Sequence, residues 1–270
     1  MNISIVCVNY NSYEKLNSFL LSLDKALLKC KGIELFVYIA DNSNKKENFD
    51  VNVSFPYKIF DYNNLGYFGG AFAIINSERN EINKSDFTII SNVDLQVDEN
   101  FFADLTQAKI DLKTAWIAPQ IYSNIDKSAK TYRIKFNRPS KKRILFLLFS
   151  FKFFLIQKIY RKTFFKNKKG LANNISQDFV YSGHGSFIVL TKVFFEAYKN
   201  EKLYYEPFLY CEENFLAELI LEKNLKVEYI PSLLIYDDEH VSTGKLPSKT
   251  FFKYNYKALK YIYTRFYKKN

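Results

Sequence analysis

The most constraining feature of the sequence is a mostly apolar run, Phe87 to Ser91, that leads directly into Asn92-Val93-Asp94. A run without regular polar alternation predicts a strand buried on both faces of a parallel sheet. Such sheets bind ligands at the carboxyl ends of their strands, where Asn92 and Asp94 can hold a divalent cation that binds a diphosphate. A solvated turn would produce the same three residues, so the accompanying motifs must decide between the two interpretations.

Two earlier apolar runs end in the same way. Ile3 to Val8 is followed by Asn9-Tyr10-Asn11, and Glu34 to Ala40 is followed by Asp41-Asn42-Ser43. Because sequential parallel strands present their carboxyl ends at one edge, the three polar clusters are expected to meet there. A carboxylate such as Asp41 can accept hydrogen bonds from a uracil or thymine ring, or from ribose hydroxyls.

A glycine-rich loop follows, with the sequence Asn-Asn-Leu-Gly-Tyr-Phe-Gly-Gly at residues 63–70. It precedes a helix that we expect from Ala71 to about Glu78. Glycine allows the backbone to approach a ligand closely, and the start of a helix favours an anion. Asn64, Gly66 and Gly69 are therefore candidate contacts to a bound ligand.

Strand and helix patterns alternate over the first half of the chain. Apolar residues at helical spacing after the first strand predict an amphipathic helix, with Asn11 and Glu14 as its capping box. Further strands are expected at Tyr57 to Phe60 and Ala115 to Ile121. This alternation predicts an α/β fold with a mostly parallel sheet and helices on both faces.

The second half has a different pattern. Phe179 to Leu190 is interpreted as one strand interrupted by the polar sequence Ser182 to Ser186. A helix is expected from Glu212 to Glu222, followed by short strands at Lys226 to Ile230 and Leu233 to Tyr236.

The net charge of +11 is unevenly distributed. Residues 127–177 hold 15 Lys or Arg and no acidic residue, and residues 240–270 hold 8 and none, which leaves 16 basic residues against all 28 acidic ones. An acidic body therefore carries a basic, aromatic-rich insert and a basic, helical C-terminal tail. Such segments suit the headgroup interface of an anionic membrane, and packing on the body or on a partner subunit would give the same pattern.

Chain length limits the number of domains, and the cysteines indicate the redox compartment. At 270 residues we expect one domain over residues 1–242, which contains the insert at 127–177, and a tail at 243–270. Cys7, Cys30 and Cys211 fit neither a metal site nor a disulfide framework, which indicates a reducing compartment. No leader peptide is expected, and no apolar run has the roughly 18–20 residues of a spanning helix.

Six motifs occur in an order that resembles a known family. They are V-C-V-N-Y-N-S, A-D-N-S, N-N-L-G-Y-F-G-G-A, S-N-V-D, S-G-H-G-S-F and Y-C-E-E-N-F-L-A-E. Together they resemble the family-2 glycosyltransferases of bacterial cell-surface polysaccharide synthesis, especially the rhamnosyltransferase-like group. The resemblance covers roughly residues 1–126 and 178–242; the basic insert and tail are not part of it.

The resemblance implies a GT-A fold and an inverting, metal-dependent transfer of a hexosyl group. The donor would be a nucleotide-diphosphate sugar, UDP- or dTDP-linked, bound with Mg or Mn. The acceptor would be a saccharide, or a polyprenyl-linked saccharide of lipopolysaccharide-type synthesis. The protein would then be cytoplasmic and peripheral on the cytoplasmic face of the inner membrane, with no nucleic acid expected as a partner.

The resemblance also implies roles for individual residues. The residues expected to bind the nucleotide-sugar are Asn9, Asn11, Asp41, Asn64, Gly66, Gly69, Asn92 and His184. The residues expected to bind the metal are Asp94 and His240. The catalytic base is expected to be Glu213, with Glu212 as the second choice. One departure is that Asn92 is neutral where many relatives carry an aspartate, which would weaken metal binding. His184 and His240 also have structural interpretations, the first as an ordinary loop histidine and the second as part of an acidic surface loop.

The chemistry of inverting transfer agrees with one positioned carboxylate. A general base takes the proton of the acceptor hydroxyl, and positive charge stabilises the departing diphosphate. Glu212 and Glu213 open a helix, whose N-terminus favours ionised acids, while their crowding should raise the pKa of one of them. Because neighbours on a helix point in different directions, only one faces the sugar, and we predict Glu213.

Two other functions remain as hypotheses. A nucleotidyltransferase would need a glycine-rich basic loop after the first strand, where this chain has Asn9 to Ser12 with Lys15 as the nearby cation. A non-catalytic module that binds membranes or nucleic acids while retaining the fold would use the basic segments and tolerate Asn92.

Overall fold

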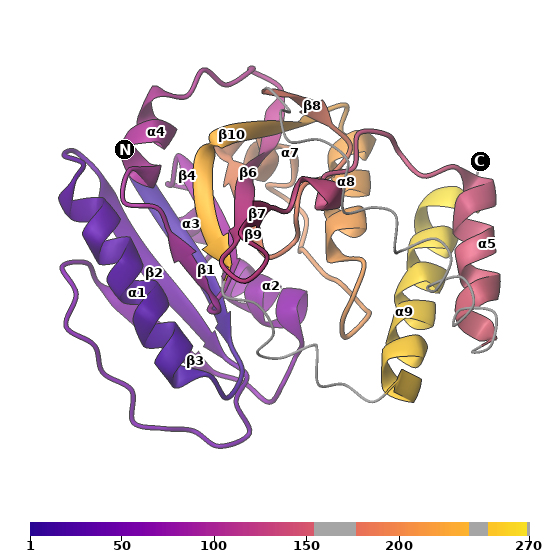
Figure 1. Cartoon of the computed structure of the whole chain (residues 1–270), viewed down its shortest axis with the longest axis horizontal. Coiled ribbons are helices and arrows are strands. Elements are labelled where there is room, and N and C mark those ends of the chain that lie inside the picture. The colour runs from indigo at the N-terminus through magenta and orange to yellow at the C-terminus, as the bar shows by residue number, and fades with distance from the viewer. Residues whose placement is uncertain (154–176, 238–247, 269–270) are drawn as a thin grey trace.

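The computed structural model describes residues 1–153, 177–237 and 248–268, and its centre is one large mixed sheet (Figure 1). The strands run in the order β3-β2-β1-β4-β9-β6-β10-β5, with β7 paired to β6 and β8 paired to β10. Their bounds are β1 Asn2–Asn9, β2 Glu34–Asp41, β3 Tyr57–Asp61, β4 Phe87–Asn92, β5 Leu95–Val97, β6 Thr114–Ser123, β7 Ser128–Ala129, β8 Asp178–Val180, β9 Phe187–Thr191 and β10 Lys226–Asp237.

The N-terminal half of the sheet is parallel, as the alternation of strands and helices predicts. Strand β1 pairs in parallel with β2 and with β4, and β2 pairs in parallel with β3. The register places Asn9 opposite Asp41, and Val8 opposite Asn92. The three polar clusters expected at one edge therefore do lie at one edge.

The C-terminal half corrects two expectations. Phe179 to Leu190 is not one interrupted strand, because β8 pairs with β10 whereas β9 lies antiparallel between β4 and β6. The two short strands expected between Lys226 and Tyr236 form the single strand β10 instead. A register shift between Ile230 and Leu234 absorbs Pro231, which cannot donate to a ladder.

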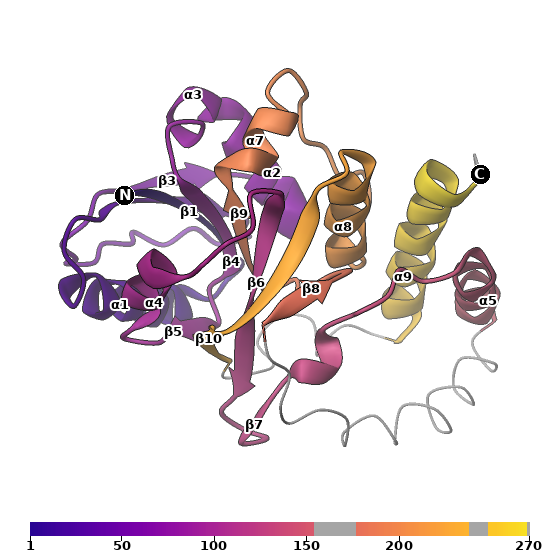
Figure 2. The same cartoon turned by 90° about the horizontal axis from the view of Figure 1, so that it is seen from above.

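Helices cover both faces of the sheet, as expected (Figure 2). Alternate side chains of β1 enter two separate apolar cores, Ile5 and Cys7 on one face and Val6 on the other. Helices α1 and α4 pack into the first core, and α2, α7 and α8 into the second. The helix bounds are α1 Tyr13–Leu28, α2 Tyr67–Ser77, α3 Arg79–Ile82, α4 Phe101–Gln107, α5 Lys141–Lys152, α7 Lys192–Ala197, α8 Glu212–Glu222 and α9 Ser248–Ile262.

The capping box expected at the start of α1 is wrong. Asn11 has a φ of 51° and turns toward the neighbouring strand end, where its Oδ1 accepts from Asn44 N at 3.0 Å. The backbone N–H of Asn11 donates to Ser43 Oγ at 2.8 Å. Asn11 therefore joins the ends of β1 and β2, and it is the Asn9 side chain that accepts from Ser12 N at 3.2 Å.

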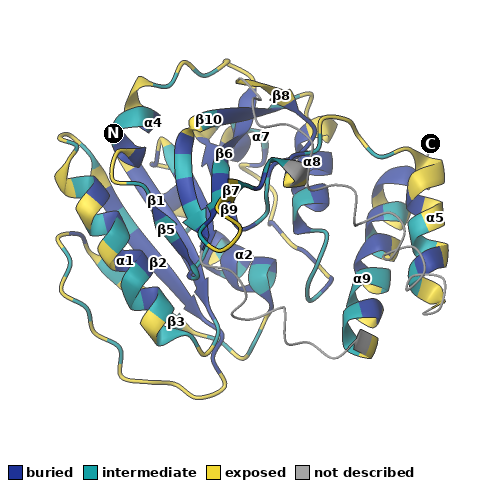
Figure 3. Cartoon of the chain, in the orientation of Figure 1, coloured by how far each residue is buried: buried dark blue, intermediate teal, exposed yellow. Residues whose placement is uncertain are grey.

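The basic tail is packed on protein over much of its length. Helix α9 packs against α5, and its Phe252, Leu259 and Ile262 are buried (Figure 3). The turn after it, Tyr263–Tyr267, buries Phe266 against the ring of Phe215 in α8. Most apolar side chains of α9 and of the turn after it thus contact the body or α5.

A buried carboxylate joins three distant segments at this junction. Glu218 of α8 accepts from Arg138 Nε at 2.9 Å and Nη2 at 2.8 Å. The hydroxyls of Tyr181 and Tyr267 also donate to Glu218 Oε1, each at 2.9 Å. A buried acid with several donors is costly to disturb, so this cluster fixes the start of the insert and the tail to α8.

The two faces of α5 differ in solvent exposure. Leu145, Phe146, Phe149 and the adjoining Phe153 are exposed, while Ile144 is buried against the body. Among the described residues, no helix is both long and apolar enough to cross a membrane.

Candidate functional site

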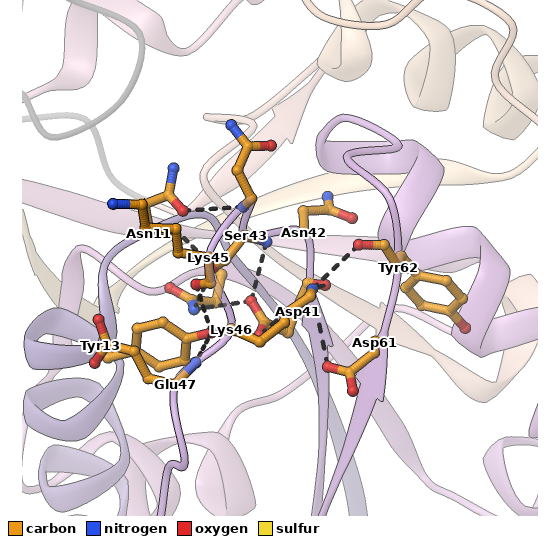
Figure 4. Close-up of polar contacts among 12 residues, drawn as sticks. Asn11, Tyr13, Asp41, Asn42, Ser43, Lys45, Lys46, Glu47, Asp61 and Tyr62 are labelled. Carbon is orange, nitrogen blue, oxygen red and sulfur yellow. Dashed lines mark hydrogen bonds and ion pairs between the residues drawn. The ribbon is translucent and has the colours of Figure 1, made fainter.

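Asp41, at the end of β2, is held by donors from neighbouring elements (Figure 4). Its Oδ1 accepts from Asn9 Nδ2 and from Ser43 N, both at 3.1 Å, and the Tyr13 hydroxyl donates to Oδ2 at 2.6 Å. Burial alone would raise the pKa of Asp41, but the bonds from Ser43 and Tyr13 and the charge of Lys46 bring it below its usual value. Asp41 is therefore an ionised, oriented acceptor at neutral pH.

Lys46 and Tyr13 complete this end of the site, and the motif analysis missed both. Lys46 Nζ lies 3.5 Å from Asp41 Oδ2 and 3.8 Å from Asp61 Oδ1, and it donates to Tyr62 O at 3.1 Å. These side chains border a cavity of about 190 Å³, lined by Tyr13, Leu16, Ile39, Asp41, Lys46, Glu47, Asn48, Phe49, Ile59 and Asp61. The sequence signal that could have identified Lys46 is the lysine pair Lys45-Lys46, one residue after the strand-end motif Asp41-Asn42-Ser43.

The glycine-rich sequence is tied to the same edge through Asn42, and its last residues belong to α2, which begins at Tyr67 and not at Ala71 as predicted. The Asn42 side chain donates to Gly66 O at 2.9 Å and accepts from Leu65 N at 3.3 Å. Gly66 has a φ of +76°, and a Cβ there would lie 2.0 Å from Phe208 O, so packing alone requires glycine. Asn64 Oδ1 accepts from Gly66 N at 3.1 Å, which shapes the loop. Contact of Asn64, Gly66 and Gly69 with a ligand stays a prediction.

Asp94 follows β4 and is half-buried. Burial, and after it the charge of Asp237, raise the pKa of Asp94 above its usual value. Asp237, at the end of β10, is itself paired with Lys130 at 2.6 Å, with both side chains about one-tenth exposed. Two carboxylates that repel each other in a partly desolvated place would be stabilised by a bound cation.

The carboxylate of Asp94 is of the kind that a Mg²⁺ or Mn²⁺ ion takes as a ligand. Such an ion takes oxygen ligands and is often held by one or two carboxylates together with substrate phosphates and water. Among the described residues, no cluster of three or more His, Cys, Asp or Glu side chains could hold a metal by itself. The second ligand expected from the sequence, His240, lies outside the described residues.

Glu212 and Glu213 begin α8, directly after Cys211, which has a φ of 62°. Glu212 is buried, its Oε1 accepts from Tyr210 N at 2.9 Å, and burial with the charge of Glu213 raises its pKa to about 8. Burial also acts on Glu213, but Lys135 Nζ, 3.1 Å from Glu213 Oε1, brings its pKa below the usual value. At neutral pH the adjacent acids thus differ in charge, with Glu213 ionised and Glu212 protonated.

His184 is neutral and faces the same region. Its Nδ1 accepts from Ser186 N at 3.1 Å, which leaves the proton of the neutral ring on Nε2. Burial, and then the charges of Arg133 and Lys130, lower the pKa of His184 to about 4. The next residue, Gly185, brings its backbone against Glu213: a Cβ there would lie 3.6 Å from Glu213 Oε2.

Ser186 connects these parts. Its carbonyl oxygen accepts from Asn92 N at 2.9 Å and from the Tyr67 hydroxyl at 3.3 Å. The end of β4, the start of α2 and the His184 loop therefore meet at one residue. Through Gly185 they also reach Glu213, so Asn92 and Glu213, far apart in the chain, converge.

The motif analysis also missed the cations on this side. Lys130 and Lys135 lie in the segment interpreted from the sequence as part of a basic attachment, yet both pair with acids at the site. No spacing rule signals such pairs, because the acids follow more than 70 positions later.

Comparison with solved structures shows the fold. GalNAc-T7 with UDP, GalNAc and Mn²⁺ matches with a TM-score of 0.53 and 14% identity, over 91% of this chain and 45% of that one. TarS of S. aureus matches with a TM-score of 0.51 and 11% identity, over 88% and 37%. The mannosyltransferase PcManGT from Pyrobaculum calidifontis, in complex with GDP-Man and Mn²⁺, matches with a TM-score of 0.53 and 8% identity, over 89% and 58%.

The chain has the GT-A fold, as the sequence motifs predict. It spans between 37% and 58% of the length of these three solved structures. No protein-family model and no curated protein matches the chain.

Proposed function

We propose that this protein is a glycosyltransferase that moves a sugar from a nucleotide-diphosphate donor to a saccharide acceptor. The observation that carries the proposal is the convergence, around Ser186, of the β4 end with the loop that contacts an ionised Glu213. The GT-A fold supports it, since the neighbours GalNAc-T7 and PcManGT are solved with UDP and with GDP-Man, each with Mn²⁺.

The donor would bind across the carboxyl edge of the parallel strands. The cavity of about 190 Å³ beside Asp41 would take the nucleoside, with the Asp41 carboxylate as acceptor for base or ribose donors. Asp94 would hold a Mg²⁺ or Mn²⁺ ion, which supplies positive charge to the diphosphate. Lys130 and Arg133, whose charges act on His184, add positive potential on the same side.

Glu213 would act as the general base of an inverting transfer. Its carboxylate is ionised, lies against the backbone of Gly185 and is held by Lys135, so it can take the proton of the acceptor hydroxyl as that oxygen attacks the anomeric carbon. The sugar–phosphate bond breaks as the new bond forms on the opposite face. Protonated, buried Glu212 would not compete as a base near neutral pH.

A panel of nucleotide-sugars tests the proposal. We expect one member of a set of UDP-, dTDP- and GDP-sugars to raise the melting temperature in the presence of Mn²⁺, because ligand binding to the folded state stabilises it. The same donor should then release its nucleoside diphosphate when acceptors are added. If no donor stabilises the protein with either Mn²⁺ or Mg²⁺, the proposal is wrong.

For the acceptor we propose a lipid-linked saccharide of cell-surface polysaccharide synthesis, reached from an anionic membrane surface. The outer face of α5 supports this, since Leu145, Phe146 and Phe149 are exposed beside the basic residues Lys142 and Lys152. Because the aromatic side chains of α9 are largely packed, α5 is the better candidate for membrane contact.

Vesicle flotation tests the membrane contact. We expect the protein to float with anionic vesicles at low salt and less at high salt, and not with neutral vesicles. The double variant Phe146→Ser/Phe149→Ser should lose this association, whereas Leu28→Ser/Leu112→Ser, which changes two exposed residues on the body, should keep it. Equal flotation of both variants would rule out α5 as the contact.

A further inference from the structure

Lys135 occupies a fixed position between the two halves of the site. Its backbone N–H donates to Ser182 O at 2.9 Å, and its carbonyl accepts from Tyr181 N at 2.7 Å and from Ser182 N at 3.1 Å. This bridge attaches Lys135 to the segment that continues into the His184 loop. The backbone of Lys135 is therefore held by this isolated bridge, although the residue follows strand β7 by several positions.

The Lys135 side chain reaches the start of α8. Its Nζ lies 3.1 Å from Glu213 Oε1 and also donates to Asn214 Oδ1. The exposed fractions of the Lys135 and Glu213 side chains are 36% and 30%, so the pair is partly shielded from water. Contacts to two successive residues of one helix turn hold the ammonium group in one place, which a single contact would not.

The charges around Glu213 come from three elements. Cys211 and Glu212 adjoin it on its own helix, Lys135 comes from the segment after β7, and His184 comes from the loop before β9. His184 is neutral near pH 7, and the partial burial of Cys211 raises the pKa of its thiol above the usual range. Within the described parts of the chain, Lys135 is therefore the cation that pairs with Glu213 when Glu213 is ionised.

Glu212 has a different set of contacts from Glu213. The Glu212 carboxylate accepts a backbone N–H from Tyr210, while Glu213 pairs with the lysine. Two adjacent acids at the start of a helix repel each other when both are ionised. The acid whose anion is less stabilised therefore has the higher pKa and is protonated first. Lys135 stabilises the anion of Glu213 by direct contact, while burial disfavours the anion of Glu212.

We propose that Lys135 is a positioning residue that makes Glu213, and not its neighbour Glu212, the ionised carboxylate and holds it in place for proton abstraction. The inference rests on the proposed function for its catalytic meaning. Its electrostatic part concerns only the two glutamates and Lys135, and it can be measured without any substrate.

The variants are Lys135→Met, which removes the charge at similar length, and Lys135→Arg, which keeps it. Lys223→Met is the matched control, because Lys223 pairs with Glu201 on the surface, away from the site. In protein labelled with ¹³C at glutamate carboxyl carbons, Glu213→Gln and Glu212→Gln assign the two signals. Thermal unfolding establishes that each variant is folded.

We expect the Glu213 titration midpoint to move to higher pH in Lys135→Met, and the midpoints of Glu212 and Glu213 to move closer together. Lys135→Arg should restore most of the separation, and Lys223→Met should leave it unchanged. A Glu213 midpoint that is the same in wild type and in Lys135→Met overturns the inference, whether or not the protein is a glycosyltransferase.

Activity supplies a second readout. With the donor found in the panel, the acidic limb of the kcat/KM profile should move to higher pH in Lys135→Met, so that the loss of rate is larger at pH 6 than at pH 8. A loss that is equal at every pH, with weaker donor binding, would mean that Lys135 contacts the donor instead, and that result also overturns the inference. A wild-type protein that turns over no nucleotide-sugar refutes the proposed function alone, because the titrations are independent of it.

Discussion

The two ends of the candidate site are built in different ways. Asp41 is held by residues within the first 46 positions of the chain, from β1, α1 and the loop after β2. Glu213 is held by Lys135, 78 positions earlier, and lies against Gly185 from a third segment. The proposed nucleoside end, at Asp41, is thus assembled by one βαβ unit, whereas the proposed transfer end, at Glu213, forms only when distant segments have docked.

The difference has an electrostatic consequence. Asp41 owes its low pKa to several hydrogen bonds from neutral groups as well as to Lys46, so no single partner determines its charge. The low pKa of Glu213 depends chiefly on Lys135. We therefore expect the transfer end to respond to single substitutions and to pH more strongly than the nucleoside end.

A large effect should come from Asp94→Asn, which removes the carboxylate that we propose as the metal ligand while keeping its size. Donor turnover should fall by roughly 100-fold or more, because charge stabilisation of a departing group is typically worth several kcal/mol. The measurement is the Mn²⁺ dependence of nucleoside diphosphate release. Asp86→Asn, which changes the opposite end of the same strand, is the control.

A change in the pH dependence of stability should follow from Glu212→Gln. The pKa of Glu212 is raised from 4.5 to about 8, so between these values the folded state keeps a proton that the unfolded state has lost. The contribution of Glu212 to stability therefore falls as pH rises, with a slope of up to about 1.4 kcal/mol per pH unit.

Chemical denaturation at pH 5.5 and pH 8 measures this effect. Glu212→Gln should be more stable relative to wild type at pH 8 than at pH 5.5, and the exposed Glu196→Gln should give the same difference at both. A stability difference between Glu212→Gln and wild type that does not change with pH would mean that Glu212 is already ionised in the folded protein.

The smallest effect should come from Tyr13→Phe at the nucleoside end. The change removes the hydroxyl that donates to Asp41 at 2.6 Å but leaves Asn9, Ser43 and Lys46 in place. One hydrogen bond to a charged group is worth about 1.5–3 kcal/mol, but the three remaining partners keep Asp41 ionised and oriented, so nucleotide affinity should fall by less than this, about two- to tenfold. Calorimetric titration measures it, with Tyr57→Phe as control because Tyr57 donates to Asp50 away from the cavity. A loss of nucleotide affinity beyond about 100-fold would show that the Asp41 end is as sensitive to a single substitution as the Glu213 end.

The same contrast explains how much of the molecule could be predicted from the sequence. The parallel strands and their polar ends were predictable because buried runs and strand-end side chains are local signals, and parallel pairing brings the ends together. The helix at Glu212 to Glu222 was predictable for the same reason, from the spacing of its apolar residues. The GT-A fold followed from the order of these motifs.

The rest depends on contacts between distant segments. The separation of β8 from β9 was not predictable, because sequence alone does not say which strand each one pairs with. Lys130 and Lys135 resembled other lysines of a basic stretch until folding placed them beside Asp237 and Glu213. The tail also had a membrane-like composition, whereas its packing follows from aromatic contacts with α8.

The most direct test of the whole account compares donor binding with transfer in Glu213→Gln. On the same samples, we expect the donor Kd to stay within about threefold of wild type while transfer falls 10²- to 10⁴-fold, the usual contribution of a general base. A large loss of transfer with nearly unchanged donor affinity is the result expected when a general base is removed beside an intact donor site. Transfer at the wild-type rate, or a loss of donor binding as large as the loss of transfer, would contradict the account.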